Sequence, residues 1–407
     1  MESVLCHIHH LQTSFLKGVF DFRNTQMIIT IKLTSLAWNI YDGYQIERIS
    51  KSISDLVAKE NTNPKQLRVL EQRRKLSVQK LPNLLEYLGY IYCFPTLMVG
   101  PAFEYNTYNE AITGEVFQGK RKSNVSLVYS SAWEAGRSFI IGLFFLVCFL
   151  LSGHKYPIAK LVDPAVVEST PFLQRVVLLY LAAYTIRFRF FYAWRVAEAA
   201  TKLAGFGFEG YSAQGEIVGW NAVSNVDILG VELATSVQQI VRCWNIRTQS
   251  WLETYVYQRF GRSLIMTYLV SALWHGFYPG FYVFFLAIAL LTNVERQART
   301  KIHPVVTTQI IDRYFVPGTV GRTVATSVYG FSCWSFTFAL FNACIPYFFL
   351  LSWERCVAYA RAYYYIQPLT LVGLQVALSC VPAKWVKSGG GKAVVVPGER
   401  GGKEHVQ

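Results

Sequence analysis

The stretch SFIIGLFFLVCFLL, residues 138–151, decides the fold class of this chain. It contains no charged residue, and its length approaches the ~20 apolar residues with which an α-helix crosses a bilayer. Two longer stretches point the same way, because residues 264–292 contain no Asp, Glu, Lys or Arg and residues 324–353 contain none either. We therefore predict an all-α fold, a polytopic transmembrane helical bundle.

Weaker apolar runs lie on both sides of these stretches. With them the chain is expected to form about seven membrane helices, the additional runs being residues 27–40, 84–103, 172–186 and 357–381. Many runs contain Gly or Pro, which membrane segments tolerate mainly where the backbone is buried in protein or lines a cavity. The pattern predicts an internal tunnel rather than a bundle of simple anchors.

The composition excludes an ordinary soluble domain. Hydrophobic residues make up 52% of the chain and charged residues 16%, whereas soluble domains carry about 25% charged residues. The N-terminus has no positive region followed by an apolar core, so no signal peptide is predicted. We expect a polar N-terminal segment (1–26), a multi-span domain (27–385) with a polar extramembrane loop (51–80), and a Gly-rich disordered tail (386–407).

The excess of basic residues narrows the choice of partners. The net charge is +14, and basic residues gather between the apolar runs, at residues 68–80, 120–122 and 296–301. Binding to nucleic acid is one explanation of such clusters, but short basic loops beside membrane spans more often mark the cytosolic side of the membrane. We therefore predict no nucleic acid partner, and expect membrane lipids or a phosphate-bearing cofactor at these loops.

Metal and disulfide chemistry have little support. The eight cysteines form no CxxC pair and mostly lie in apolar stretches, which is typical of small core residues. His7, His9 and His10 could form a metal cluster, but no Cys, Asp or Glu stands at ligand spacing beside them. We predict no metal site and no bound cofactor.

One histidine stands apart from the others. His275 lies within LIMTYLVSALWHGFYPGFYVFFLAIALL, where tyrosines are the only other ionisable groups. An ionisable side chain at membrane depth is costly and marks a functional site by default, although a core histidine bonded to a backbone carbonyl is the alternative. Gly276, Pro279 and Gly280 favour function, because they loosen the helix around the ring. A neutral imidazole there fits a general base.

The residues around His275 resemble a known family. SALWHGFYPGFY (271–282) is similar to the His motif of the membrane-bound O-acyltransferase superfamily, and WNIRTQSWL (244–252) is similar to the Asn motif of its lysophospholipid acyltransferase branch. Four further segments match in family order, which brings the coverage to roughly residues 28–295: AWNIYDG (37–43), PTLMVGPAFEY (95–105), RFRFFYAWRVAEAA (187–200) and GFGFEGY (205–211).

The resemblance implies a function. It predicts transfer of an acyl group from acyl-CoA, a co-substrate, to the free hydroxyl of a lysophospholipid, in the endoplasmic reticulum membrane. It also implies further N-terminal membrane helices, so that a truncated, inactive chain is an alternative. Asn245 matches the second polar residue of the family, as an oxyanion donor or as a partner that orients His275. With no serine or cysteine arranged as a nucleophile, direct attack by the lipid hydroxyl is favoured over an acyl-enzyme.

Further residues are candidates for substrate binding. Arg187, Trp194 and Glu198 recur at helical spacing on one face, and Trp274 adjoins the predicted base. The structural alternative for this face is an Arg195–Glu198 pair beside packed aromatic rings. The same two readings remain open for three acidic residues near apolar stretches, namely Asp42, Glu104 and Glu232.

Rival functions lack support from sequence motifs. GFGFEG (205–210) fits the dinucleotide pattern GxGxxG but follows an Ala-rich helical stretch rather than a strand. No HxxxxD spacing and no GxSxG elbow occurs, which counts against soluble acyltransferases and lipases. A sterol, diacylglycerol or protein acceptor remains the main alternative. A transporter that relays protons through His275 would require further charged groups at membrane depth, and the span offers none.

Overall fold

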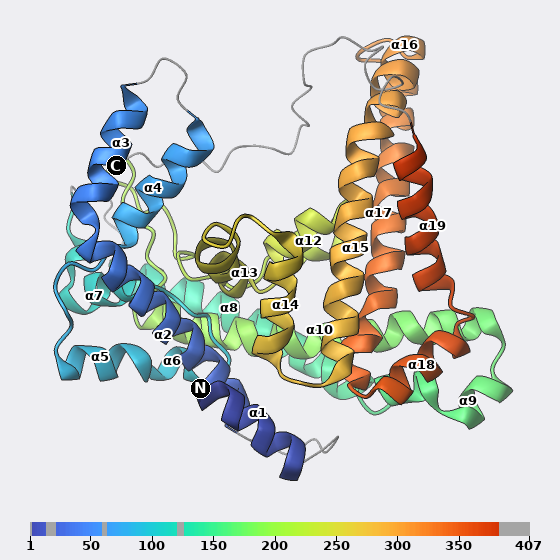
Figure 1. Ribbon diagram of the computed structural model, residues 1–407, viewed down its shortest axis with the longest axis horizontal. Helices are drawn as coiled ribbons and strands as arrows, with labels where there is room; N and C mark the ends of the chain where they lie inside the picture. Colours follow the sequence, from blue (N-terminus) through green and yellow to red (C-terminus); the bar gives the residue numbers. More distant parts are fainter. Residues whose placement is uncertain (1, 14–21, 59–62, 120–125, 382–407) are drawn as a thin grey trace.

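The computed structural model describes residues 2–13, 22–58, 63–119 and 126–381 (Figure 1). Within these ranges the chain forms helices and no strand, apart from one isolated bridge between Tyr211 and Ile217. The predicted all-α fold is confirmed. The predicted disordered tail (386–407) and the basic cluster at residues 120–122 lie outside the described residues.

Three helices are long and apolar enough to cross a membrane, namely α8 (Leu127–Ser152), α10 (Phe172–Leu203) and α17 (Val320–Leu350). On α8, small residues at helical spacing, Ser131, Ala135, Ser138 and Gly142, are buried. A Cβ on Gly142 would lie 3.0 Å from a Val196 methyl of α10. Small residues allow two membrane helices to pack this closely, so α8 and α10 lie side by side along their length.

The part of the chain that the structure describes thus contains three candidate membrane helices, whereas about seven were expected. The run at residues 264–292 is two helices, α14 (Leu264–His275) and α15 (Pro279–Lys301). Gly276 separates them, because its φ of 131° is open only to glycine. The runs at 84–103 and 357–381 are also divided, into α5 (Leu84–Ile91) and α6 (Phe94–Leu97), and into α18 (Trp353–Ala362) and α19 (Ile366–Cys380).

Helices α15, α17 and α19 form a second group, which runs upward in Figure 1 while α8 and α10 lie across its lower end. A proline at position 346 lies inside α17, which continues through it to Leu350, although proline usually breaks or kinks a helix. Gly280 allows α15 to meet the end of α17: its N–H donates to the Leu351 carbonyl at 2.7 Å. A Cβ on Gly280 would collide with the Tyr347 carbonyl oxygen at 2.4 Å.

The N-terminal part surrounds α2 (Arg23–Tyr44), with α3 (Ile46–Val57) and α4 (Pro64–Leu76) projecting as a hairpin in Figure 1. The predicted polar loop at 51–80 thus contains the end of α3 and all of α4. The remaining elements are α1 (Glu2–Thr13), α7 (Tyr105–Thr113), α9 (Pro164–Ser169), α11 (Ile228–Glu232), α12 (Val237–Cys243), α13 (Ile246–Trp251), α16 (Asp312–Tyr314), 3₁₀ turns at Glu115–Phe117 and Ile158–Val162, and π turns at Leu252–Tyr257 and Val305–Ile311.

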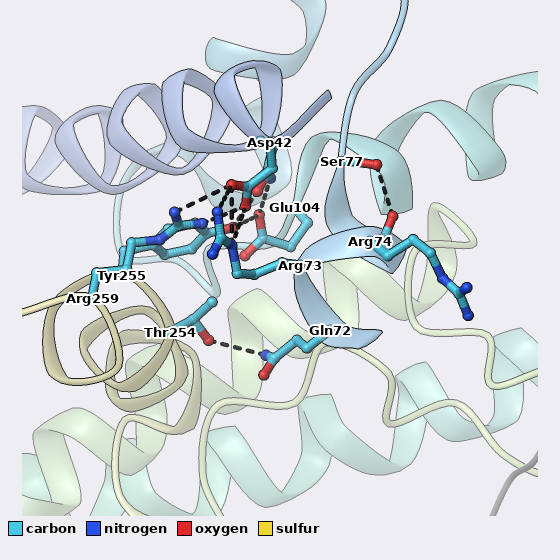
Figure 2. A network of polar contacts seen from close by, with 10 residues as sticks. Asp42, Gln72, Arg73, Arg74, Ser77, Glu104, Thr254, Tyr255 and Arg259 are labelled. Atoms are coloured by element: carbon cyan, nitrogen blue, oxygen red, sulfur yellow. Dashed lines mark hydrogen bonds and ion pairs between the residues drawn. The ribbon is translucent and has the colours of Figure 1, made fainter. Parts of the chain in front are cut away.

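A buried carboxylate anchors the hairpin to the rest of the fold (Figure 2). The Asp42 side chain is 1% exposed and accepts bonds from Arg73 of α4 at 2.6 Å and from Arg259 at 2.5 Å. The Arg259 guanidinium also lies 4.2 Å from the centre of the Trp38 ring. The structure therefore indicates that the role of Asp42 is to form structural ion pairs rather than to contact a substrate.

Replacing Asp42 by asparagine is expected to destabilise the protein by about 3–5 kcal/mol, because two arginines then lose a desolvated counter-charge. The thermal midpoint of the detergent-solubilised protein, followed by fluorescence-detected size exclusion, measures the loss. Arg137→Gln is the matched control, since it breaks a 3.7 Å pair whose arginine is 68% exposed and whose contribution is about 0–1 kcal/mol. Equal midpoints for the two variants would contradict the anchoring role.

Candidate active site

A cavity of about 490 Å³ lies between α10, α12, α13, α14, α15 and α17. Its wall follows one face of α15, where Phe284, Ile288, Thr292 and Arg296 recur at steps of four residues. At 1.5 Å per residue these positions span roughly 18 Å. The facing wall, on α14, includes Tyr268, Ser271 and His275. The site is therefore an elongated cavity, in keeping with the predicted tunnel.

The two ends of the cavity differ in chemistry. The Tyr268 hydroxyl bonds to Thr292 at 3.1 Å, and seven residues further along α14 the His275 ring stacks on Phe285, so α14 and α15 run antiparallel. At one end His275 lies among aromatic rings. Exposed Arg296 lies at the opposite end of the α15 wall, and exposed Arg242 also lines the cavity, as do Glu253 and Glu295. Neither arginine forms an ion pair with any residue that the structure describes. The cavity thus joins a basic mouth to an apolar end.

His275 is the last residue of α14, which ends there because of the Gly276 backbone. Its half-buried ring stacks on Phe285 at 5.4 Å between centroids and meets the Phe348 ring edge-on at 4.8 Å. Phe281 lies at 5.6 Å and Trp274 at 4.7 Å. These aromatic walls surround the imidazole with groups of low polarity, and a low local dielectric strengthens electrostatic interactions.

Asn245 lines the same cavity from the start of α13. Its backbone is left-handed, with φ 48° and ψ 51°, a conformation that asparagine adopts more readily than most residues. Its carbonyl accepts the N–H of Gln249 at 3.0 Å, but its side chain caps no N–H of α13. The Asn245 side chain therefore does not cap the helix that it precedes, and it lines the cavity.

Two of the four predicted substrate-binding residues also line the cavity. Arg187 is held in place by Glu232 at 2.7 Å and by the Asn342 side-chain oxygen at 2.5 Å. Trp194 packs edge-on against Trp244, with ring centres 4.8 Å apart. The structure thus brings Arg187 and Trp194 together with His275 and Asn245, although these residues are far apart in the sequence.

Glu198 lies outside the cavity lining. Its side chain is 1% exposed and pairs with Arg195 at 2.8 Å, the structural arrangement considered above. It also accepts the Asn225 N–H at 2.7 Å. Asn225 in turn accepts the N–H groups of Ile246 and Arg247, at 2.8 and 3.1 Å. Glu198 therefore acts on the backbone that follows Asn245, through a residue that the sequence motifs did not single out.

Trp274 also faces away from the cavity. Its indole N–H donates to the Met27 carbonyl at 3.0 Å, and its ring packs against Trp251 at 6.1 Å between centroids. These contacts tie the end of α14 to α2. Trp274 is thus placed to hold the neighbouring His275, not to touch a ligand in the cavity.

Glu104, another of the three acidic candidates, belongs to a buried polar cluster beside Asp42 (Figure 2). It accepts bonds from the Asn39 amide and the Tyr255 hydroxyl, both at 2.8 Å. Burial raises the pKa of the Glu104 carboxyl, and these two bonds oppose the rise. Glu104 is not among the residues that line the cavity, so its environment supports the structural reading.

The fold and the cavity define an all-α membrane protein in which one histidine and one asparagine line the same cavity. Comparison with known proteins agrees with the resemblance found in the sequence motifs. The chain belongs to the membrane-bound O-acyltransferase (MBOAT) family, whose model matches residues 18–334.

Curated relatives narrow the branch of the family. "Membrane-bound glycerophospholipid O-acyltransferase 1" of Homo sapiens is 29% identical over 380 residues, which cover 90% of this chain and 70% of that protein. The mouse protein of the same name is 31% identical over 73% of this chain and 58% of its own length. "Lysophospholipid acyltransferase" of Schizosaccharomyces pombe is 28% identical over 73% of this chain, but the match covers only 57% of that relative.

Proposed function

We propose that this protein is a lysophospholipid acyltransferase, which moves a fatty acyl group from acyl-CoA to the free hydroxyl of a lysophospholipid. The observation that supports this most directly is the shared cavity, which is lined by His275 and Asn245 and by two exposed arginines that have no acidic partner among the described residues. The names of the relatives favour a lysophospholipid acceptor over a sterol, diacylglycerol or protein.

In the proposed reaction His275 takes the proton from the lipid hydroxyl as its oxygen attacks the thioester carbonyl. The carbonyl becomes a tetrahedral oxyanion, which the Asn245 amide stabilises; such a donor is worth about 3–4 kcal/mol. The C–S bond then breaks, and the imidazolium returns its proton to the CoA thiolate. The products are a phospholipid and CoA, and no acyl-enzyme is formed.

The remaining predicted residues are assigned supporting roles. Arg187 and Trp194 bind substrate along the cavity wall, and the guanidinium of Arg187 keeps its position because two side chains already bind it. Glu198 and Trp274 act from outside the cavity by positioning Asn245 and His275. The basic mouth faces the cytosol in an endoplasmic reticulum membrane, as the excess of basic residues there favours.

Arg242 and Arg296 are proposed to bind the phosphates of acyl-CoA. Both are exposed at the cavity mouth and without an acidic partner among the described residues, and guanidinium groups bind phosphate through paired charge-assisted bonds. The double variant Arg242→Gln, Arg296→Gln is expected to raise the KM for acyl-CoA about tenfold while the KM for the lysophospholipid stays unchanged. Steady-state kinetics with each substrate varied in turn measures the split, and a rise in both KM values would contradict the assignment.

The proposed function is tested by acyl transfer from labelled oleoyl-CoA to a panel of lysophospholipids differing in head group. Microsomes expressing the chain are compared with microsomes from the same host carrying an empty vector. Labelled phospholipid above the empty-vector level supports the proposal and identifies the head group. A sterol ester, triacylglycerol or acylated protein as the only labelled product would overturn it in favour of another acceptor.

A further inference from the structure

Helix α1 brings two buried histidines to the loop that carries His275. His7 is 4% exposed and His10 is 6% exposed, whereas His9, between them, is exposed. Residues three apart on a helix share a face, so the buried pair faces inward. The sequence offered a metal cluster for these histidines, but the structure places two of them against protein groups.

The contacts of the pair fall on both sides of His275. His7 Nε2 lies 3.1 Å from the Trp274 carbonyl oxygen, and a Cβ on Gly276 would lie 3.1 Å from the His7 ring. His10 Nδ1 lies 3.3 Å from the Tyr278 hydroxyl. Helix α1 therefore contacts the residues just before and just after the proposed base.

The His7 contact provides a hydrogen-bond donor for a backbone carbonyl at the end of α14. The last carbonyls of an α-helix have no intrahelical N–H partner, and α14 ends one residue after Trp274. Since a carbonyl oxygen only accepts, His7 donates from Nε2 and caps α14. The ring of His7 also covers Gly276, whose backbone turns the chain away from the helix in a conformation open only to glycine.

We propose that His7 and His10 are positioning residues for the acyl-transfer site, which fix the loop at residues 274–278 and thereby the imidazole of His275. This rests on the proposed function, in which His275 is the base. Neither histidine is among the residues that line the cavity, so both act through the backbone and Tyr278. A displacement of about 1 Å at a reacting group costs on the order of 100-fold in rate.

Three variants of α1 test the proposal. His7→Leu is expected to lower kcat about 10- to 100-fold with the KM of both substrates unchanged, because binding does not use this contact. His7→Gln keeps an N–H donor near the Trp274 carbonyl and is expected to restore most of the rate. His9→Leu makes the same change on the exposed face and is expected to behave as wild type.

Hydrogen exchange gives a readout that does not depend on activity. In purified protein, the amides of residues 274–278 are expected to exchange faster in His7→Leu than in His9→Leu. Tyr278→Phe removes the His10 contact without changing α1 and is expected to speed exchange in the same loop. If His7→Leu matches His9→Leu in both rate and exchange, the positioning role is wrong.

The two proposals fail in different ways. Should wild type transfer no acyl group to any lysophospholipid, the proposed function falls, and exchange alone then decides whether α1 fixes the loop. Should wild type be active and His7→Leu lose rate without any change in exchange or with a raised KM, the positioning role falls while the proposed function stands.

Discussion

Replacing His275 by alanine is expected to lower kcat for acyl transfer by about 10²- to 10⁴-fold, the contribution of a positioned general base. The alanine variant retains the aromatic walls formed by Phe285 and Phe348, so substrate binding should change little. Product formation from labelled oleoyl-CoA and a lysophospholipid, at equal expression in microsomes, measures the effect.

His303→Ala is the matched control for this loss. Like His275, His303 stacks on an aromatic ring, that of Tyr329, whose hydroxyl lies 3.0 Å from His303 Nδ1, but it is not among the residues that line the cavity. Its replacement is expected to leave kcat unchanged. If both variants keep wild-type activity, His275 is not the base.

Asn245→Gly is expected to lower kcat by about 10²- to 10³-fold, the usual effect of removing one oxyanion donor. Glycine adopts the left-handed backbone of this position without strain, so the variant removes the amide and keeps the turn that begins α13. The reaction rate is measured with saturating acyl-CoA and lysophospholipid. Asn245→Ala is the comparison, because it removes the amide and also strains the backbone at φ 48°.

Two outcomes separate the possible roles of Asn245. An oxyanion donor lowers kcat equally at every pH, whereas a partner that orients the imidazole also shifts the pH at which kcat/KM falls. If Asn245→Gly stays fully active while Asn245→Ala does not, the backbone conformation matters and the amide has no chemical role.

The fold class and part of the candidate site can be predicted from patterns within single stretches of sequence. An uncharged run such as residues 138–151 is apolar whatever surrounds it, and the cost of exposing its backbone to lipid leaves a helix as the stable form. His275 can be singled out because an ionisable group is conspicuous in such a run. The Arg195–Glu198 pair also follows from spacing alone, since residues three apart on a helix are neighbours.

Contacts between distant segments are not visible in local patterns. The Asp42 ion pairs join α2 to Arg73 and Arg259, and nothing near Asp42 in the sequence names these partners. The two exposed arginines that line the cavity likewise come from different helices, Arg242 from α12 and Arg296 from α15. Sequence spacing identified Arg296 only as part of a basic loop.

Hydropathy and the helical period are properties of single segments, so the residue pattern alone predicts an all-α membrane protein with a histidine in an apolar run. The packed helices were needed to show where that run breaks, which predicted residues share the cavity, and that Glu198 and Trp274 lie outside its lining. They also place His7 beside Trp274, 267 positions away. Such contacts depend on how helices pack against one another, and side-chain packing is a property of the assembled fold.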